Sequence, residues 1–238
     1  MTITFKNVYI KETSTIAGIY EANGPLRSEF DKTYTKDLYF GESSWEKAEI
    51  KLLYDSISLL LKKSKQKETD IDLLISGDLQ NQIASSDYAS RKFNIPFLGI
   101  YNACATSSEG MIIGATFIDS KKIKNCIVAT VSHNTSAEKQ YRNPTEYGAP
   151  KPDTATFTVT GGASILLTQE KTDIKIDNVQ NELIFTYYNK NSWNNFKVIP
   201  FSNENIAKYL PNYKSVYETY KKVVQKLDEN MVVVPAYE

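Results

Sequence analysis

Helical and strand-forming segments alternate along residues 43–131, and this alternation limits the chain to few folds. An amphipathic helix is predicted from Trp45, just inside the Ser-x-x-Glu capping pattern of Ser43 and Glu46, to the lysine-rich residues 62–67. The segments that follow are a strand at 71–75, a helix at about 86–93, a strand from Phe97, a helix at 111–119 and a strand at 126–131. Further strands are predicted at 3–10 and 156–167. The alternation predicts an α/β protein with a largely parallel sheet.

Three chemically distinctive residues each follow one of these apolar strands. Asp78 comes after the strand at 71–75, Cys104 after the strand from Phe97, and His133 after the strand at 126–131. The carboxyl ends of parallel strands lie at one edge of a sheet, and ligands bind there. We therefore expect Asp78, Cys104 and His133 to share one rim.

Cys104 lies where an apolar strand gives way to small residues and then to a helix. The first N–H groups of a helix have no intrahelical partner and carry part of its positive dipole. A sulfur held there has its thiolate favoured, which makes the thiol reactive. The alternative is that Cys104 is a small, buried and inert residue, as free cysteines often are.

Two other sets of residues have plain structural interpretations. Cys126 opens a strand and is expected in the core. The acids at the start of the long helix are expected to cap it or to lie on its solvated face; they are Glu42, Glu46 and Glu49.

The segment from Ser132 to Thr156 is polar and rich in specific residue types. Its three prolines and Gly148 argue against a long regular element, so a long loop is predicted. Loops longer than about 12 to 15 residues in compact domains are usually functional or disordered. Tyr141, Tyr147 and the charged residues suit contact better than solvation, so a functional loop is expected.

Charge and cysteine content exclude several classes of protein. The 28 basic and 28 acidic residues cancel, which argues against nucleic-acid binding and against a basic membrane-binding face. Two cysteines imply no disulfide framework and favour a reducing compartment. The first residues lack the apolar core of a signal peptide, and no run approaches the ~20 apolar residues of a membrane-spanning helix. A soluble protein is expected, cytoplasmic or held at a membrane through partners.

Short motifs across residues 24–168 carry a resemblance to a known family. In order they are Gly24-Pro25-Leu26, Phe30-Asp31, Gly41-Glu42, Ser44-Trp45-Glu46, Ala48-Glu49, Gly77-Asp78-Leu79, Asn81-Gln82, Ala103-Cys104, Ser132-His133-Asn134, Ala137-Glu138, Pro144-Thr145-Glu146-Tyr147-Gly148 and Lys151-Pro152-Asp153-Thr154-Ala155-Thr156. With these motifs the chain resembles the stage V sporulation protein AD family of endospore-forming bacteria, in the thiolase superfamily. The resemblance implies a thiolase-like N-terminal half over residues 1–170, with a layered, mixed and mostly parallel sheet that has helices on both faces.

Residues 171–238 depart from that resemblance. All ten glycines lie at or before Gly162, whereas a second thiolase-type half needs tight glycine turns and a longer chain. Strands at 174–176 and 231–234 and a helix around 213–227 are predicted here. We expect a short, diverged α+β extension that packs on the first half, in a truncated or a diverged relative.

The resemblance implies binding rather than catalysis. Proteins of this family are understood to bind dipicolinate (pyridine-2,6-dicarboxylate) or its calcium chelate as part of the SpoVA spore transport system, in sporulation and in germination. The implied partners are other SpoVA proteins at the spore inner membrane, and a homodimer through the sheet edge is compatible with the superfamily. No cofactor and no protein-bound metal are expected.

A planar dianion needs cationic or N–H donors for its carboxylates and a wall for its ring. Arg142 and Lys151 are expected to meet the carboxylates, and Tyr147 or Tyr141 the ring. Asp78 or Asp153 either faces calcium or caps a turn. The residues expected at this site are Asp78, Cys104, His133, Asn134, Arg142, Glu146, Tyr147, Lys151, Asp153 and Thr156.

Two other functions stay open. The first is an acyltransferase of the thiolase or ketoacyl-synthase type that uses Cys104 as nucleophile. Enzymes of that superfamily take a histidine from their second half, whereas the single histidine here is His133, which either approaches Cys104 or is a hydrogen-bonded loop residue. The second is a structural partner that has lost its ligand.

Overall fold

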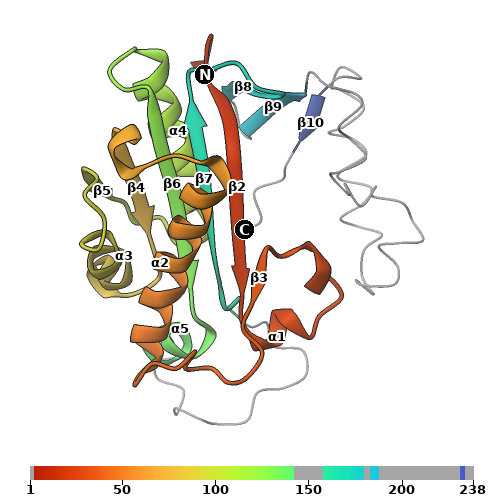
Figure 1. Ribbon diagram of the computed structural model, residues 1–238, viewed down its shortest axis with the longest axis vertical. Coiled ribbons are helices and arrows are strands. Elements are labelled where there is room, and N and C mark those ends of the chain that lie inside the picture. Colours follow the sequence, from red (N-terminus) through yellow and green to blue (C-terminus); the bar gives the residue numbers. More distant parts are fainter. Residues whose placement is uncertain (1–2, 142–157, 180–182, 188–230, 234–238) are drawn as a thin grey trace.

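The structure is a computed structural model that describes residues 3–141, 158–179, 183–187 and 231–233. The described strands form one ten-stranded sheet with the order β10-β9-β8-β2-β7-β6-β4-β5, and β1 and β3 pair with β8 and β2 (Figure 1). Their bounds are β1 (Ile3–Thr4), β2 (Tyr9–Ala17), β3 (Lys32–Thr33), β4 (Leu73–Gly77), β5 (Phe97–Gly99), β6 (Asn125–Ser132), β7 (Gly161–Thr168), β8 (Ile174–Val179), β9 (Leu183–Tyr187) and β10 (Met231–Val233).

Helices connect the strands. The α-helices are α1 (Ile19–Ala22), α2 (Trp45–Ser64), α3 (Ala84–Ser90), α4 (Thr106–Asp119) and α5 (Asn134–Tyr141), and the short 3-10 turns are η1 (Arg27–Glu29), η2 (Glu68–Asp70), η3 (Asn81–Ile83) and η4 (Ala103–Ala105). Ser44 caps α2, since its hydroxyl accepts from the Lys47 N–H at 3.3 Å. The predicted long helix is therefore confirmed, with the cap one residue later than the capping pattern indicated.

The sheet is mixed. Strands β5, β4 and β6 run parallel to one another, and β2 is parallel to β3. β7 lies antiparallel between β6 and β2, and β8 and β9 continue antiparallel beyond β2. The predicted α/β class with a mixed sheet is confirmed. The parallel strands β4, β5 and β6 come from the part of the sequence in which helices and strands alternate.

Helices cover opposite faces of the sheet. Leu52, Leu53 and Ile57 of α2 belong to one buried cluster with Ile127 and Ala129 of β6. The intervening β6 residues belong to a second cluster with α4, which contains Met111, Ala115, Ile118, Cys126 and Val128. Because side chains alternate along a strand, α2 and α4 lie on different faces. Cys126 is thus a core residue, as predicted.

Two predicted segments differ from the structure. The strand expected at 3–10 is broken, because the N–H groups of Lys6 and Asn7 donate to Asp119 Oδ1 at 2.7 and 3.3 Å, and the long strand β2 starts only at Tyr9. The long loop expected from Ser132 begins instead with helix α5. The prolines that argued against a helix start at Pro144, beyond its last residue.

The part of the tail that is described joins the same sheet. β8 pairs with β1, β2 and β9, and β9 pairs with β10. The helix predicted around 213–227 lies outside the described residues. Among the described helices, none is both long enough and apolar enough to span a bilayer.

Candidate functional site

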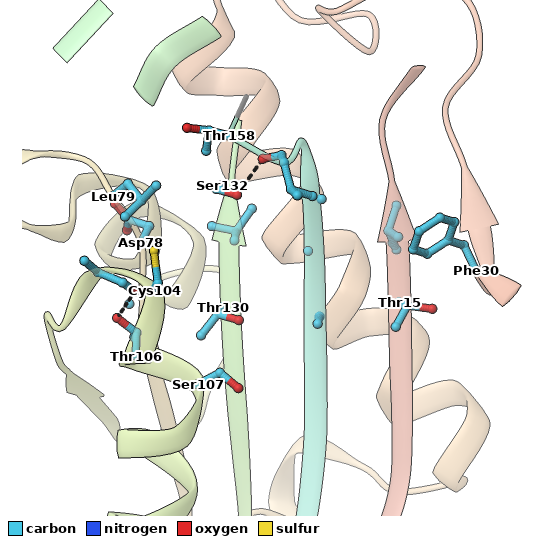
Figure 2. Close-up of a pocket in the computed structure, with 18 of the residues that line it drawn as sticks. Thr15, Phe30, Asp78, Leu79, Cys104, Thr106, Ser107, Thr130, Ser132 and Thr158 are labelled. Atoms are coloured by element: carbon cyan, nitrogen blue, oxygen red, sulfur yellow. Dashed lines mark hydrogen bonds between the residues drawn. The ribbon is translucent and has the colours of Figure 1, made fainter. Parts of the chain in front are cut away.

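A cavity of about 730 Å³ opens at the carboxyl ends of β4 and β6. Cys104, Asp78 and Leu79 line one side of it, and Thr15 of β2 and Phe30 line the other (Figure 2). The floor of the cavity is formed by the sheet. Thr130 and Ser132 of β6 project there from the same face that α4 covers nearer the start of β6. The strand ends therefore form a hollow, as the sequence predicted.

Cys104 lies in an exposed elbow between β5 and α4. Ala103 before it has φ +44°, a left-handed conformation that is unfavourable for a residue with a Cβ. Thr106 fixes this turn, since its hydroxyl accepts from the Asn102 N–H at 3.1 Å and donates to the Ala103 carbonyl at 2.8 Å. The alternative of a buried, inert thiol is excluded, because Cys104 lines the cavity.

Gly77 lets the ends of β4 and β5 approach each other. A Cβ at this position would lie 2.2 Å from the Ile100 carbonyl oxygen and 2.7 Å from Cγ2 of Thr106. No side chain fits there. The absence of a Cβ at Gly77 thus brings the Asp78 turn and the Cys104 elbow into one site.

Asp78 lines the cavity, but backbone groups occupy its carboxylate. The side chain is only 3% exposed, and its two oxygens accept from the N–H groups of Gln80 and Ser86, each at 2.7 Å. Burial raises the pKa of Asp78, while these hydrogen bonds lower it. The main effect of Asp78 is therefore to hold the turn between β4 and α3.

His133 follows β6 as expected but points away from Cys104. Its ring is fully buried beside Phe40, at 5.8 Å between ring centroids. Nδ1 accepts from the Thr135 N–H at 3.2 Å, which assigns the proton to Nε2, and Nε2 donates to the Leu38 carbonyl at 2.8 Å. Burial lowers the pKa of His133 and so favours the neutral ring. The structure agrees with the hydrogen-bonded loop histidine, because both nitrogens already have partners.

Asn134 holds the chain that enters β7. Its N–H donates to Thr160 Oγ1 at 2.9 Å, and its side-chain amide donates to the Thr158 carbonyl at 3.2 Å. It is buried and is not among the cavity-lining residues. Its role in the structure is to fix one end of the segment that carries the remaining predicted residues.

Six predicted site residues lie outside the described residues. They are Arg142, Glu146, Tyr147, Lys151, Asp153 and Thr156. The described residues on either side of this segment reach the cavity, since Glu138 of α5 and Thr158 both line it.

Sequence reasoning missed most of the described lining. The missed residues include Thr15, Phe30, Ser107, Thr130, Ser132, Glu138 and Thr158. The alternation along β6 was the available signal, since it places Thr130 and Ser132 on the face opposite Ala129 and Val131. Among the described lining residues the only charged groups are the carboxylates of Asp78 and Glu138, and no cluster suited to a metal ion occurs in the described part of the chain.

One further acid was misjudged. Glu49 was expected at the helix start or on its solvated face, yet it is fully buried between α2 and α5. Helical spacing did predict the apolar face. Only the structure shows that α5 and the turn after β4 cover the helix on the side of Glu49.

Two solved structures with a similar fold are 3-oxoacyl-(acyl carrier protein) synthases III. The 3-oxoacyl-(acyl carrier protein) synthase III of Xanthomonas oryzae has a TM-score of 0.50 and 15% identity over 76% of this chain and 62% of its own. The 3-oxoacyl-[acyl-carrier-protein] synthase III of Aquifex aeolicus also has a TM-score of 0.50, with 14% identity over 71% of this chain and 56% of its own. At these identities the similarity establishes the thiolase-like fold alone.

Sequence similarity is more specific. The chain is 43% identical over 169 residues to stage V sporulation protein AD of Bacillus subtilis, which covers 71% of this chain and 50% of that protein. The chain thus spans about half the length of the curated relative it matches. The sequence model of the family described as stage V sporulation protein AD matches residues 1–226, which extends past the boundary expected at residue 170. The chain has a thiolase-like fold and, by its sequence, belongs to the stage V sporulation protein AD family.

Proposed function

We propose that this protein is a non-catalytic, dipicolinate-binding component of the SpoVA spore transport system, acting in sporulation and germination. Membership of the stage V sporulation protein AD family supports the sporulation role. The observation that carries a binding role is an open cavity at the strand ends whose exposed thiol has no histidine beside it.

The surroundings of Cys104 favour binding over acyl transfer. A nucleophilic cysteine gains much of its rate from an adjacent base and from an oxyanion site. The one histidine of this sequence has both ring nitrogens bonded elsewhere, and the carboxylate of Asp78 is held by two N–H groups. Neither is free to take the thiol proton.

The cavity lining suits a polar ligand that carries its own cation. Hydroxyls of Ser107 and Thr130 supply hydrogen-bond donors, while the carboxylate of Asp78 lies on the described wall. A free dianion is disfavoured beside a carboxylate, whereas its calcium chelate is neutral. The chelate therefore fits this wall better.

Cations for the ligand carboxylates come from the segment 142–157 in this proposal. Arg142 and Lys151 belong to that segment, and its flanking residues Glu138 and Thr158 line the cavity. Tyr147 supplies a ring to stack on the pyridine.

The proposal places the protein at the spore inner membrane through other SpoVA proteins, with a homodimer as a further expectation. β5 ends the order of the described strands, and Leu98 within it and Tyr101 just after it are exposed. An unpaired edge strand with apolar side chains is a surface on which a second copy can pair.

A thiolase-type acyltransferase is the second candidate, favoured by the exposed Cys104 and the fold shared with synthase III enzymes. It predicts that an acyl-CoA thioester adds its acyl group to Cys104. The check is intact-mass spectrometry of the chain after incubation with acyl-CoA, with Cys104→Ala as the control. The binding proposal predicts no mass increase.

Calorimetric titration of the chain with dipicolinate, with and without calcium, tests the proposal. We expect saturable binding that is tighter with calcium and at least about tenfold weaker in Arg142→Ala. Arg91→Ala is the matched control, because Arg91 lies at the end of α3 against Tyr88 and outside the cavity. Absence of saturable binding by the folded chain would contradict the proposal and favour a structural partner that has lost its ligand.

A further inference from the structure

A buried carboxyl group joins the two segments that flank the cavity. Glu49 of α2 is 0% exposed. Its Oε2 contacts the hydroxyl of Ser136 on α5 and accepts from Nε2 of Gln80, in the turn after β4, at 3.1 Å. Its Oε1 is buried and has no hydrogen-bond partner in the described part of the chain. Glu49 is therefore the point at which α2, α5 and the β4–α3 turn meet.

Counting hydrogens at Ser136 indicates a proton on Glu49. The Ser136 hydroxyl has one hydrogen, yet its oxygen is within bonding distance of Glu49 Oε2 and, at 3.1 Å, of the His133 carbonyl. Both contacts become hydrogen bonds when Glu49 donates to Ser136 and Ser136 donates to His133. An ionised Glu49 leaves one of them unmade and also leaves a bare charge in the core.

The groups around Glu49 also favour the neutral acid. Burial and, to a smaller extent, the nearby carboxylate of Asp78 raise the pKa of Glu49 to about 8, although hydrogen bonds from Ser136 and Gln80 lower it. One turn earlier on α2, Glu46 pairs with Lys139 of α5 at 2.7 Å. His133, which precedes α5, is neutral by its hydrogen bonds. Thus, within the described ranges, none of the elements packed on Glu49 places a cation within hydrogen-bonding distance of its carboxyl.

The turn that Glu49 holds is strained. Gln82 and Ile83 have φ values of +61° and +49°, and a left-handed conformation is especially unfavourable for β-branched Ile83. Such a turn persists only where its surroundings hold it. Three sets of hydrogen bonds stabilise this turn. They are those accepted by Asp78, the one from Gln80 to Glu49, and one of 2.9 Å from the Asn81 N–H to Gln140 Oε1 of α5.

We propose that protonated Glu49 is a latch that fixes the β4–α3 turn and α5 against each other, and that loss of its proton loosens both walls of the cavity. Asp78 and Leu79 line the cavity from the turn, and Glu138 lines it from α5. Glu49 acts through these segments and touches no ligand, so it is a positioning residue. The inference holds for any ligand of the cavity.

The sign of the pH dependence follows from the raised pKa. The neutral acid stabilises the fold fully below the ordinary value of 4.5, and this contribution is lost as pH rises from there to about 8. Within that window the unfolding equilibrium constant rises up to about tenfold per pH unit because of this one proton. Above about pH 8 the contribution is constant.

Denaturant unfolding of the whole chain between pH 5 and 9 tests the latch with three variants. Glu49→Gln keeps an N–H donor for Ser136 without an ionisable proton. We therefore expect its stability to be close to that of the original chain at pH 5, with a pH slope reduced by one proton, so that it becomes the more stable of the two as pH rises. Glu49→Ala is expected to be less stable than Glu49→Gln at every pH. Glu46→Gln is the matched control on the same helix; because Lys139 lowers the pKa of Glu46, its slope between pH 5 and 8 should equal that of the original chain.

Hydrogen exchange directly measures how often the two cavity walls open. At pH 6 we expect Glu49→Ala to exchange about tenfold faster than Glu49→Gln in residues 79–86 and 134–141. Infrared spectra of the unaltered chain should also show a protonated carboxyl band that fades between pH 6 and 9 and is missing in Glu49→Gln. An unchanged pH slope in Glu49→Gln, equal exchange in the two variants, or absence of that band would overturn the proposal.

Discussion

The ends of β4 and β6 differ from the end of β5, although all three open on the same side of the sheet. After β4 and β6, Asp78 and His133 are buried and fully engaged by neighbouring backbone groups. After β5, Cys104 is exposed in a strained elbow. Position after a parallel strand therefore brings a residue to the rim but does not decide whether its side chain is free for a ligand.

The difference has a packing cause. The turns after β4 and β6 lie between α2, α3 and α5, where polar side chains must find partners because water is excluded. The β5 strand is at the sheet edge, so the elbow that follows it has a neighbour on one side only. The turns after β4 and β6 thus form a rigid frame for the site, and the thiol of Cys104 in the elbow after β5 is the accessible chemical group.

The largest effect is expected from Gly77→Ala, which forces the frame and the elbow apart. The new Cβ would overlap the Ile100 carbonyl, so we expect a loss of about 3 kcal/mol in the free energy of unfolding, measured by urea denaturation. Gly24→Ala is the control, since its Cβ meets nothing closer than 3.2 Å. If Gly77→Ala lowers the free energy of unfolding no more than the control does, Gly77 is not needed for the close approach of β4 and β5.

A smaller effect should separate Asp78 from Cys104. Asp78→Ala leaves two buried N–H groups without acceptors, and we expect it to lower the free energy of unfolding by about 2 kcal/mol. Cys104→Ala should change it by less than about 0.5 kcal/mol. Asp87→Ala, an exposed acid in the first turn of α3, is the control for charge near the helix start. Equal losses at 78 and 104 would show that the two turns do not differ as described.

The smallest effect concerns the pH dependence of His133. Burial lowers its pKa in the folded chain, so its contribution to stability is present above the ordinary value of 6.5 and is lost as pH falls toward the lower folded value. We expect a loss of about 1 kcal/mol or less on this acid side, absent in His133→Gln. Unfolding curves at pH 5 to 7 check it. Identical acid-side losses in both proteins would mean that His133 is exposed to protonation when folded.

Much of the fold followed from local patterns. Helical spacing and a serine cap identified α2, and apolar runs between turn residues identified β4, β6 and β7. β2 was missed beyond Ile10, because Lys11, Glu12 and Thr13 resemble a loop when taken alone. Antiparallel pairing with β7, interrupted by a bulge between Ile10 and Glu12, is what makes these residues a strand.

The site was predictable in position rather than in detail. Topology placed Asp78 and Cys104 on one cavity, as expected. The engagement of Asp78, the orientation of His133 and the burial of Glu49 depend on α5 and its contacts, and the prolines from Pro144 onward had suggested a loop there. A helix of eight residues in a polar segment has no strong sequence signal of its own.

Protection of Cys104 from alkylation tests the central claim most directly. In the folded chain iodoacetamide should modify Cys104 and not Cys126, which is buried in the core and whose pKa burial raises to about 12. We predict that saturating calcium dipicolinate slows modification of Cys104 at least about tenfold, because ligand and reagent compete for one cavity. Calcium dipicolinate that binds without changing the alkylation rate of Cys104 would contradict the assignment of the ligand to this cavity.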